Sequence, residues 1–159
     1  MIIKGLIDED FVNYKTASMV IEFPHCDFKC DKENCNQLCQ NSHLIKEPDI
    51  SISYEKIAER YLSNPITQAI IFQGLEPIDS SSDVINLIDT FRKKYHCDDD
   101  IVIYTGYKER EIQSFIEQLK QYKNIIVKFG RFRPYLNSCY DPVLKVNLAS
   151  NNQYAKKIS

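Results

Sequence analysis

Apolar residues recur at helical spacing in three stretches of the chain. In each stretch they fall three and four residues apart, which is the spacing of one face of an α-helix. We therefore predict three helices whose apolar faces pack into the core. Their core-facing residues are Tyr54, Ile57, Ala58, Tyr61 and Leu62; Val84, Leu87, Ile88, Phe91 and Tyr95; and Ile112, Phe115, Ile116 and Leu119.

Short runs rich in β-branched residues lie between and around these helical stretches. They read SMVIEF, QAIIFQ, DIVIYT, NIIVKF and, near the end, VLKVNL. Strands that alternate with helices are typical of an α/β fold with a mainly parallel sheet. Residues 1–17 precede the pattern, and we predict that this N-terminal extension packs on the sheet edge. With 159 residues and no linker or internal repeat, the sequence predicts a single domain over residues 1–159.

Three of the four glycines come directly after predicted strands: Gly74, Gly106 and Gly130. The cysteine-rich stretch follows SMVIEFP in the same way, and ASNNQ follows VLKVNL. The carboxyl ends of parallel strands meet at one edge of a sheet, where ligands bind and where glycine lets the backbone come close to them. The sequence therefore predicts a ligand site at this edge.

The overall composition argues against several classes of partner. Hydrophobic residues make up 43% and charged residues 26%, near the average for a globular protein, and the net charge is -2. This balance gives no general attraction to nucleic acid or acidic lipid. The start, MIIKGLIDEDF, does not fit a signal peptide, and no run approaches the roughly 20 apolar residues that span a bilayer. We predict a cytoplasmic protein with no nucleic-acid or membrane partner, in which thiols stay reduced.

Four cysteines fall within the stretch CDFKCDKENCNQLC: Cys26, Cys30, Cys35 and Cys39. Clustered thiols in a reducing compartment indicate a metal site or catalysis. A zinc site would use all four thiolates, although the separation between the two pairs is short for zinc. Iron–sulfur clusters accept compact runs of cysteines from a single loop. The spacing favours an iron–sulfur cluster, with zinc and a set of unliganded structural thiols as the other interpretations.

Five short segments resemble motifs of radical S-adenosylmethionine (SAM) enzymes, in the family's order. SMVIEFPHCDFKC, with a later cysteine, resembles the strand and CxxxCxxC loop that open the family, and GLEP at 74–77 resembles its GGEP. YTGY at 104–107, GRF at 130–132 and ASNNQ at 149–153 are similar to segments of the activating proteins of anaerobic ribonucleotide reductase. Three positions depart from these patterns. Glu33 is found where CxxxCxxC has its third cysteine, and Leu75 where GGEP has its second glycine. Phe129 is found where the subgroup has an acidic residue before GRF.

The resemblance, over residues 18–153, implies a compact partial (β/α) barrel of radical SAM type. It also implies a [4Fe–4S] cluster whose reduction cleaves SAM, giving a radical that takes hydrogen from a glycine of a partner enzyme. The implied partner is a large glycyl-radical enzyme resembling anaerobic ribonucleotide reductase, and the implied electron donor is a protein such as flavodoxin or ferredoxin. The alternative is a non-catalytic iron–sulfur or zinc module that keeps the fold but has lost the SAM chemistry.

The resemblance assigns three cysteines as cluster ligands and leaves one spare. Cys26 and Cys30 keep the family's first spacing. For the third ligand we favour Cys39 over Cys35, because Gln40-Asn41 resembles the residues that follow the third ligand in many relatives.

For SAM, the resemblance indicates that Glu76 grips the ammonium group beside the peptide of Gly74 and Leu75. Gln40 would lie near the adenine. Two weaker candidates for the pocket wall are Thr105 and Asn152. The sequence assigns no further catalytic residue.

Overall fold

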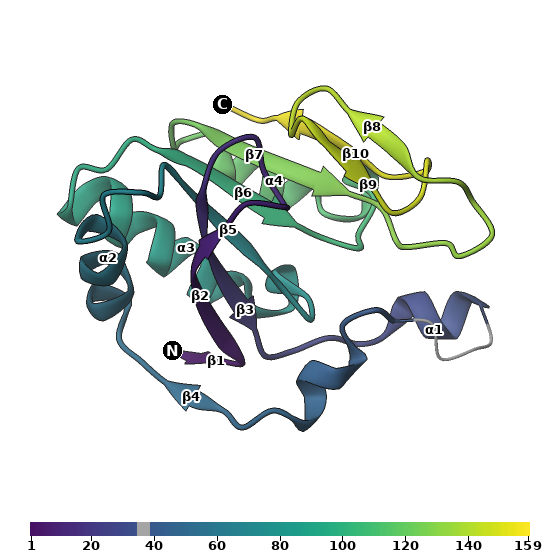
Figure 1. The fold of residues 1–159 in the computed structure, drawn as a ribbon, viewed down its shortest axis with the longest axis horizontal. Coiled ribbons are helices and arrows are strands. Elements are labelled where there is room, and N and C mark those ends of the chain that lie inside the picture. Colours follow the sequence, from purple (N-terminus) through teal and green to yellow (C-terminus); the bar gives the residue numbers. More distant parts are fainter. Residues whose placement is uncertain (35–38) are drawn as a thin grey trace.

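A computed structural model describes residues 1–34 and 39–159, whose strands form a six-stranded sheet in the order β10-β7-β6-β5-β3-β2 (Figure 1). Its four central strands are parallel: β3 (Ser18–Phe23), β5 (Ala69–Gly74), β6 (Asp100–Tyr104) and β7 (Ile125–Phe129). The prediction of an α/β fold with a mainly parallel sheet is confirmed. The described sheet is open, and the partial barrel of radical SAM type stays a prediction.

An antiparallel strand lies at each edge of the sheet. β2 (Gly5–Asp10), from the N-terminal extension, pairs with β3, and β10 (Tyr154–Lys157) pairs with β7. The sequence pattern did not predict β10, because Ala155 is its single buried residue and its lysines face solvent. Lysines on an edge strand discourage pairing with a further strand.

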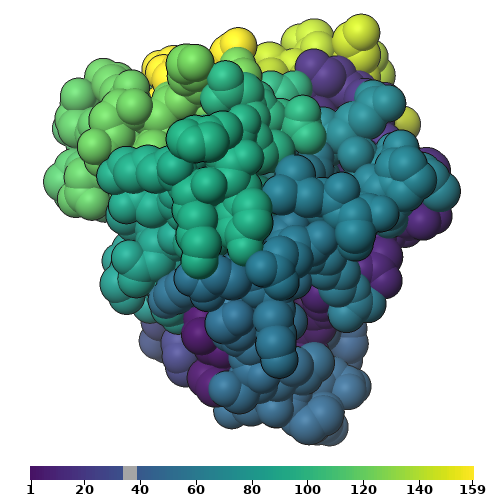
Figure 2. All heavy atoms as spheres, turned by 90° about the vertical axis from the view of Figure 1, so that its left-hand side faces the viewer, coloured from purple at the N-terminus to yellow at the C-terminus, as the bar shows by residue number. Residues whose placement is uncertain are grey.

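Three helices connect the parallel strands, as predicted. They are α2 (Tyr54–Leu62), α3 (Ser81–Asp89), which continues as a π-helical segment (Thr90–Lys94), and α4 (Gln113–Leu119). Ser53 is the N-cap of α2, and its hydroxyl accepts a hydrogen bond from the Lys56 N–H at 3.3 Å. Figure 2 shows residues of the α2 and α3 regions covering the face of the molecule on the side of α2. The placement of Leu62 in the core was wrong, since its side chain is 47% exposed at the end of α2.

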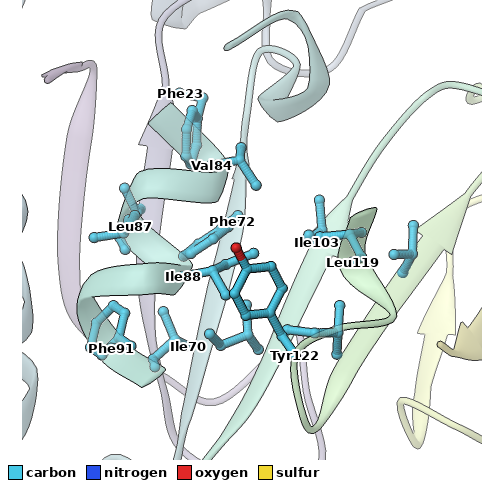
Figure 3. Packing of buried hydrophobic residues seen from close by; sticks show 14 of the residues in the cluster. Phe23, Ile70, Phe72, Val84, Leu87, Ile88, Phe91, Ile103, Leu119 and Tyr122 are labelled. Carbon is cyan, nitrogen blue, oxygen red and sulfur yellow. The ribbon is translucent and has the colours of Figure 1, made fainter. Parts of the chain in front are cut away.

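Side chains of the parallel strands alternate between two cores, as the pleat of a sheet requires. Phe23, Phe72 and Ile103 pack with the helices in the larger core, together with Leu87 and Phe91 of the α3 region (Figure 3). The alternate strand positions form a second core on the opposite face. Its members include Val20, Ile71, Val102, Ile126, Leu144 and Leu148.

The predicted strand VLKVNL does not join the parallel sheet. Only its last part is extended, as β9 (Val146–Leu148), which pairs with β8 (Cys139–Asp141) in a separate antiparallel sheet. The Asp141 carboxylate accepts the N–H groups of Val143 and Leu144 at 2.9 and 2.8 Å, and Lys145 has a positive φ of 59°. This turn interrupts the apolar run, which explains why the prediction was wrong.

The remaining elements are short. β1 (Ile2–Ile3) pairs with β4 (Ile50–Ser51), and α1 (Lys29–Asn34) carries part of the cysteine-rich stretch. Three 3-10 helices are η1 (Ser42–Lys46), η2 (Pro77–Ser80) and η4 (Glu109–Glu111). None of the helices in the described ranges combines the length and the apolar character needed to cross a bilayer.

Candidate metal centre

A cavity of about 310 Å³ opens at the carboxyl ends of the parallel strands. Figure 1 shows α1 beyond these strand ends, where the chain leaves β3. Eight of the residues predicted from the sequence line the cavity: Cys26, Cys30, Cys39, Gln40, Gly74, Leu75, Glu76 and Thr105. Asn152 lies outside it and donates its amide N–H to the Arg131 carbonyl at 2.8 Å, and Cys35 falls outside the described residues.

The cysteine-rich stretch brings three thiols to this cavity through local hydrogen bonds. After β3 the chain turns at Phe28, whose φ is 53° and whose N–H donates to Cys26 Sγ at 3.2 Å. Cys30 lies on α1 one turn further on. The Cys39 N–H donates to Asp31 Oδ1 at 2.9 Å, which ties the third thiol back to the helix that carries the second.

Glu33, at the position where CxxxCxxC would place a cysteine, anchors α1 instead. Its carboxylate lies 3.4 Å from Arg131 Nε and 3.9 Å from Arg133 Nη2. Arg131 is only 3% exposed and also forms a two-pronged ion pair with Glu111, at 3.0 and 3.1 Å. α1 is therefore fastened to the segment that follows β7. Among the described cysteines, Cys39 is the third that lines the cavity.

Burial controls the ionisation of these thiols. It raises the pKa of Cys26 to about 12, and it is also the main cause of the raised pKa of Cys30 and Cys39. In the metal-free protein they are protonated at neutral pH, so that binding a metal must release protons. Three partly buried thiols that line one cavity match the donor set of an iron–sulfur cluster.

Glu76 connects the ends of two strands at the cavity wall. Its Oε2 accepts the Gly106 N–H at 2.8 Å, its Oε1 accepts the Ile78 N–H at 3.1 Å, and its side chain is 5% exposed. Burial raises its pKa to about 7, although these hydrogen bonds favour the charged form. The carboxylate thus already has protein partners, and its role toward SAM stays a prediction.

Gly74 occupies a position that only glycine fits. Its φ is 99°, and a Cβ there would lie 2.7 Å from the Phe23 backbone nitrogen. The Gly74 carbonyl accepts a hydrogen bond from Asn41 Nδ2 at 2.7 Å. Asn41, which sequence reasoning left without a role, therefore ties the end of the cysteine-rich stretch to the GLEP segment (74–77).

Lys128 lines the cavity too, and sequence reasoning missed it. It is 7% exposed, and its ammonium donates to the Gly130 carbonyl at 3.2 Å and lies 5.6 Å from the Tyr104 ring centroid. Burial lowers its pKa to about 8, while Glu76 and Cys30 act in the opposite direction. The signal in the sequence was a lysine inside the otherwise apolar run NIIVKF.

Residues 17–155 match a family described as "4Fe-4S single cluster domain". The chain belongs to this family. The family is a radical SAM-associated iron–sulfur family. The match therefore confirms the prediction that the domain binds a [4Fe–4S] cluster. No curated protein and no solved structure matches the chain.

Proposed function

We propose that this iron–sulfur domain is a radical SAM activating enzyme that generates a glycyl radical on a large partner enzyme, such as one resembling anaerobic ribonucleotide reductase. One observation carries the proposal: Cys26, Cys30 and Cys39 line the same cavity as the GLEP and YTGY segments, at the carboxyl ends of parallel strands. Ligand sites of open α/β sheets lie at this edge. The family match supports the cluster itself.

In this proposal Cys26, Cys30 and Cys39 hold the [4Fe–4S] cluster. When bound and reduced, the cluster supplies the electron that cleaves SAM into methionine and a 5′-deoxyadenosyl radical. The protein binds and orients SAM with groups from the GLEP segment and Gln40. Apolar residues that line the cavity, among them Phe132 and Leu148, limit the access of water to the site.

Two exposed apolar residues support a protein partner at the cavity. Phe11 and Val12 are 66% and 74% exposed, and Val12 also lines the cavity. Adjacent exposed apolar side chains are a feature of protein interaction surfaces. In the proposed reaction the glycine of the partner enters here, and a low-potential protein such as flavodoxin or ferredoxin supplies the electron.

A second candidate function is a non-catalytic metal-binding module, and particular contacts favour it. The Glu76 carboxylate is engaged by backbone N–H groups, and Leu75 replaces a glycine of GGEP. Ligand atoms of Cys26, Asp27 and Asp79 lie within 4.8 Å of one another, a mixed sulfur and oxygen set that suits zinc better than an iron–sulfur cluster.

Anaerobic reconstitution with iron and sulfide, followed by metal analysis, separates these candidates. The proposed enzyme should take up about four irons per chain, as a [4Fe–4S] cluster requires. Reduced with dithionite and given SAM, it should release 5′-deoxyadenosine. Stoichiometric zinc without iron uptake would favour the metal-binding module, as would a reduced cluster that releases no 5′-deoxyadenosine even beside its candidate partner.

A further inference from the structure

The chemistry described so far gives no role to Lys128, whose charge lies inside the cavity. Lys128 is on β7, at a strand position that faces away from the three helices. The Thr105 N–H donates to its carbonyl at 2.9 Å, so the backbone that carries it is held within the sheet. The side chain is 7% exposed and shares the cavity with all three described thiols of the cysteine-rich stretch.

Within residues 1–34 and 39–159 the Lys128 ammonium has no carboxylate at ion-pair distance. Its hydrogen-bond partner is the neutral Gly130 carbonyl, and no ion pair within 4.0 Å includes it. Glu76 lines the same cavity and attracts the ammonium electrostatically, but its oxygens accept backbone N–H groups and do not contact Lys128. Burying a charge without a close partner of opposite sign is unfavourable. An anionic occupant of the cavity would therefore stabilise the ammonium of Lys128.

An iron–sulfur cluster held by three thiolates is such an occupant. The cluster with its thiolates is negative in both oxidation states and becomes more negative when it takes up an electron. A fixed positive charge in a poorly solvated cavity stabilises the more negative state, and net charge and burial are known determinants of cluster potentials. The effect needs no direct contact with sulfur, because electrostatic interactions extend over several ångström inside a protein.

We propose that the Lys128 ammonium is the counter-charge of the reduced cluster and raises the reduction potential of the cluster. This inference rests on the part of the proposed function that assigns the cluster to Cys26, Cys30 and Cys39, and it does not depend on SAM cleavage. The step concerned is the transfer of one electron from dithionite to the cluster, with no covalent bond formed or broken in the protein. Lys128 is thus a residue that tunes the cluster and not a ligand.

The test is a redox titration of reconstituted protein without SAM, followed by the electron paramagnetic resonance signal of the reduced cluster. The variants are Lys128→Met, which removes the charge, and Lys128→Arg, which keeps it. Lys120→Met is the matched control, because it removes an exposed lysine at the end of α4 that pairs with Glu117 at 2.6 Å. At the midpoint potential of the wild type, we expect the ratio of reduced to oxidised cluster to fall about tenfold in Lys128→Met, as expected for a charge lost at short range.

Lys128→Arg and Lys120→Met should titrate close to the wild type. An unchanged potential in Lys128→Met with a full complement of iron would overturn the inference. If Lys128→Met does not assemble a cluster, Lys128→Gln is titrated in its place with the same criteria. If both neutral variants lose the cluster but Lys128→Arg retains it, the result supports a requirement for the positive charge. If all three variants lose the cluster, the inference is overturned. A wild type that assembles no cluster would instead refute the proposed function.

Discussion

The ion pair between Glu111 and Arg131 is expected to stabilise the fold in a pH-dependent way. The hydrogen-bonded Arg131 guanidinium lowers the pKa of Glu111 from 4.5 to about 2. At about 1.4 kcal/mol for each tenfold change in proton affinity, this corresponds to an upper limit of about 3 kcal/mol. The Glu111 side chain is 32% exposed, so that water screens the pair and we expect about 1.5 kcal/mol in practice.

Glu111→Gln removes the charge and keeps a side chain of the same shape. At pH 7 the free energy of unfolding should fall by about 1.5 kcal/mol, or about 3–6 °C in Tm for a chain of this size. Because the pKa of Glu111 is lower in the folded protein, its contribution is complete above pH 4.5 and is lost as the pH falls toward 2. At pH 3 less than half of the difference in the free energy of unfolding between Glu111→Gln and the wild type should remain.

Urea denaturation of the cluster-free protein under reducing conditions, repeated from pH 7 to pH 3, measures this effect. Glu117→Gln is the matched control, since Glu117 also pairs with a cation, Lys120 at 2.6 Å, but is 67% exposed. Pairs of that kind contribute little to stability. A Glu111→Gln effect that does not change with pH, or that equals the effect of the control, would show that the pairing with Arg131 is not what lowers the pKa of Glu111.

Three further predictions concern the cysteine-rich stretch and the strand end beside it. Cys39→Ala should reduce the iron of reconstituted protein from about four per chain to less than about one, whereas Cys35→Ala should keep about four; the reverse pattern would make Cys35 the third ligand. Gly74→Ala should lower the free energy of unfolding by about 3 kcal/mol, because of its positive φ and the backbone contact at 2.7 Å. Gly106→Ala is the control, because a Cβ at Gly106 would lie 3.5 Å from its nearest neighbours, and it should lower the free energy of unfolding by less than about 1 kcal/mol. Equal effects of the two substitutions in urea denaturation would contradict this account. Glu33→Gln should speed the loss of iron to a chelator about threefold, as a partly exposed ion pair predicts, and an unchanged rate would show that this anchor does not affect the cluster.

The central sheet and the three helices could be predicted from the sequence because each has a strong local pattern. Strands such as AIIFQG are buried on both faces, and α3 buries Val84, Leu87 and Ile88 at helical spacing. The C-terminal region lacked such a pattern. Its apolar run is broken by the turn at Asp141 and Lys145, which depends on side-chain hydrogen bonds, and β10 is held in the sheet mainly by backbone pairing with β7.

The location of the candidate site followed from the sequence, but its internal contacts did not. Cysteines and glycines after strands predicted which edge of the sheet to consider, and the cavity lies there. The partners of Glu76 could not be predicted, because the Gly106 N–H reaches it from a different strand end. Lys128 was overlooked because alternation within a strand does not reveal which face of the sheet carries the ligand site.

The proposed third ligand, Cys39, lies further along the sequence than the third cysteine of CxxxCxxC. Cys30 and Cys39 are separated by eight residues, where CxxxCxxC has two. Closing the longer loop costs only about 1 kcal/mol more in chain entropy, because this cost grows with the logarithm of loop length. The Cys39 N–H donates a hydrogen bond to the Asp31 carboxylate at 2.9 Å, and a protein hydrogen bond contributes about 1 kcal/mol. That contact can offset the entropy of the insertion, and the pairing of Glu33 with Arg131 fixes the direction in which α1 leaves the strand end. If Cys39 is the third ligand, as proposed, Glu33 at the consensus position serves as an anchor of α1 and the ligand lies at the far end of the loop.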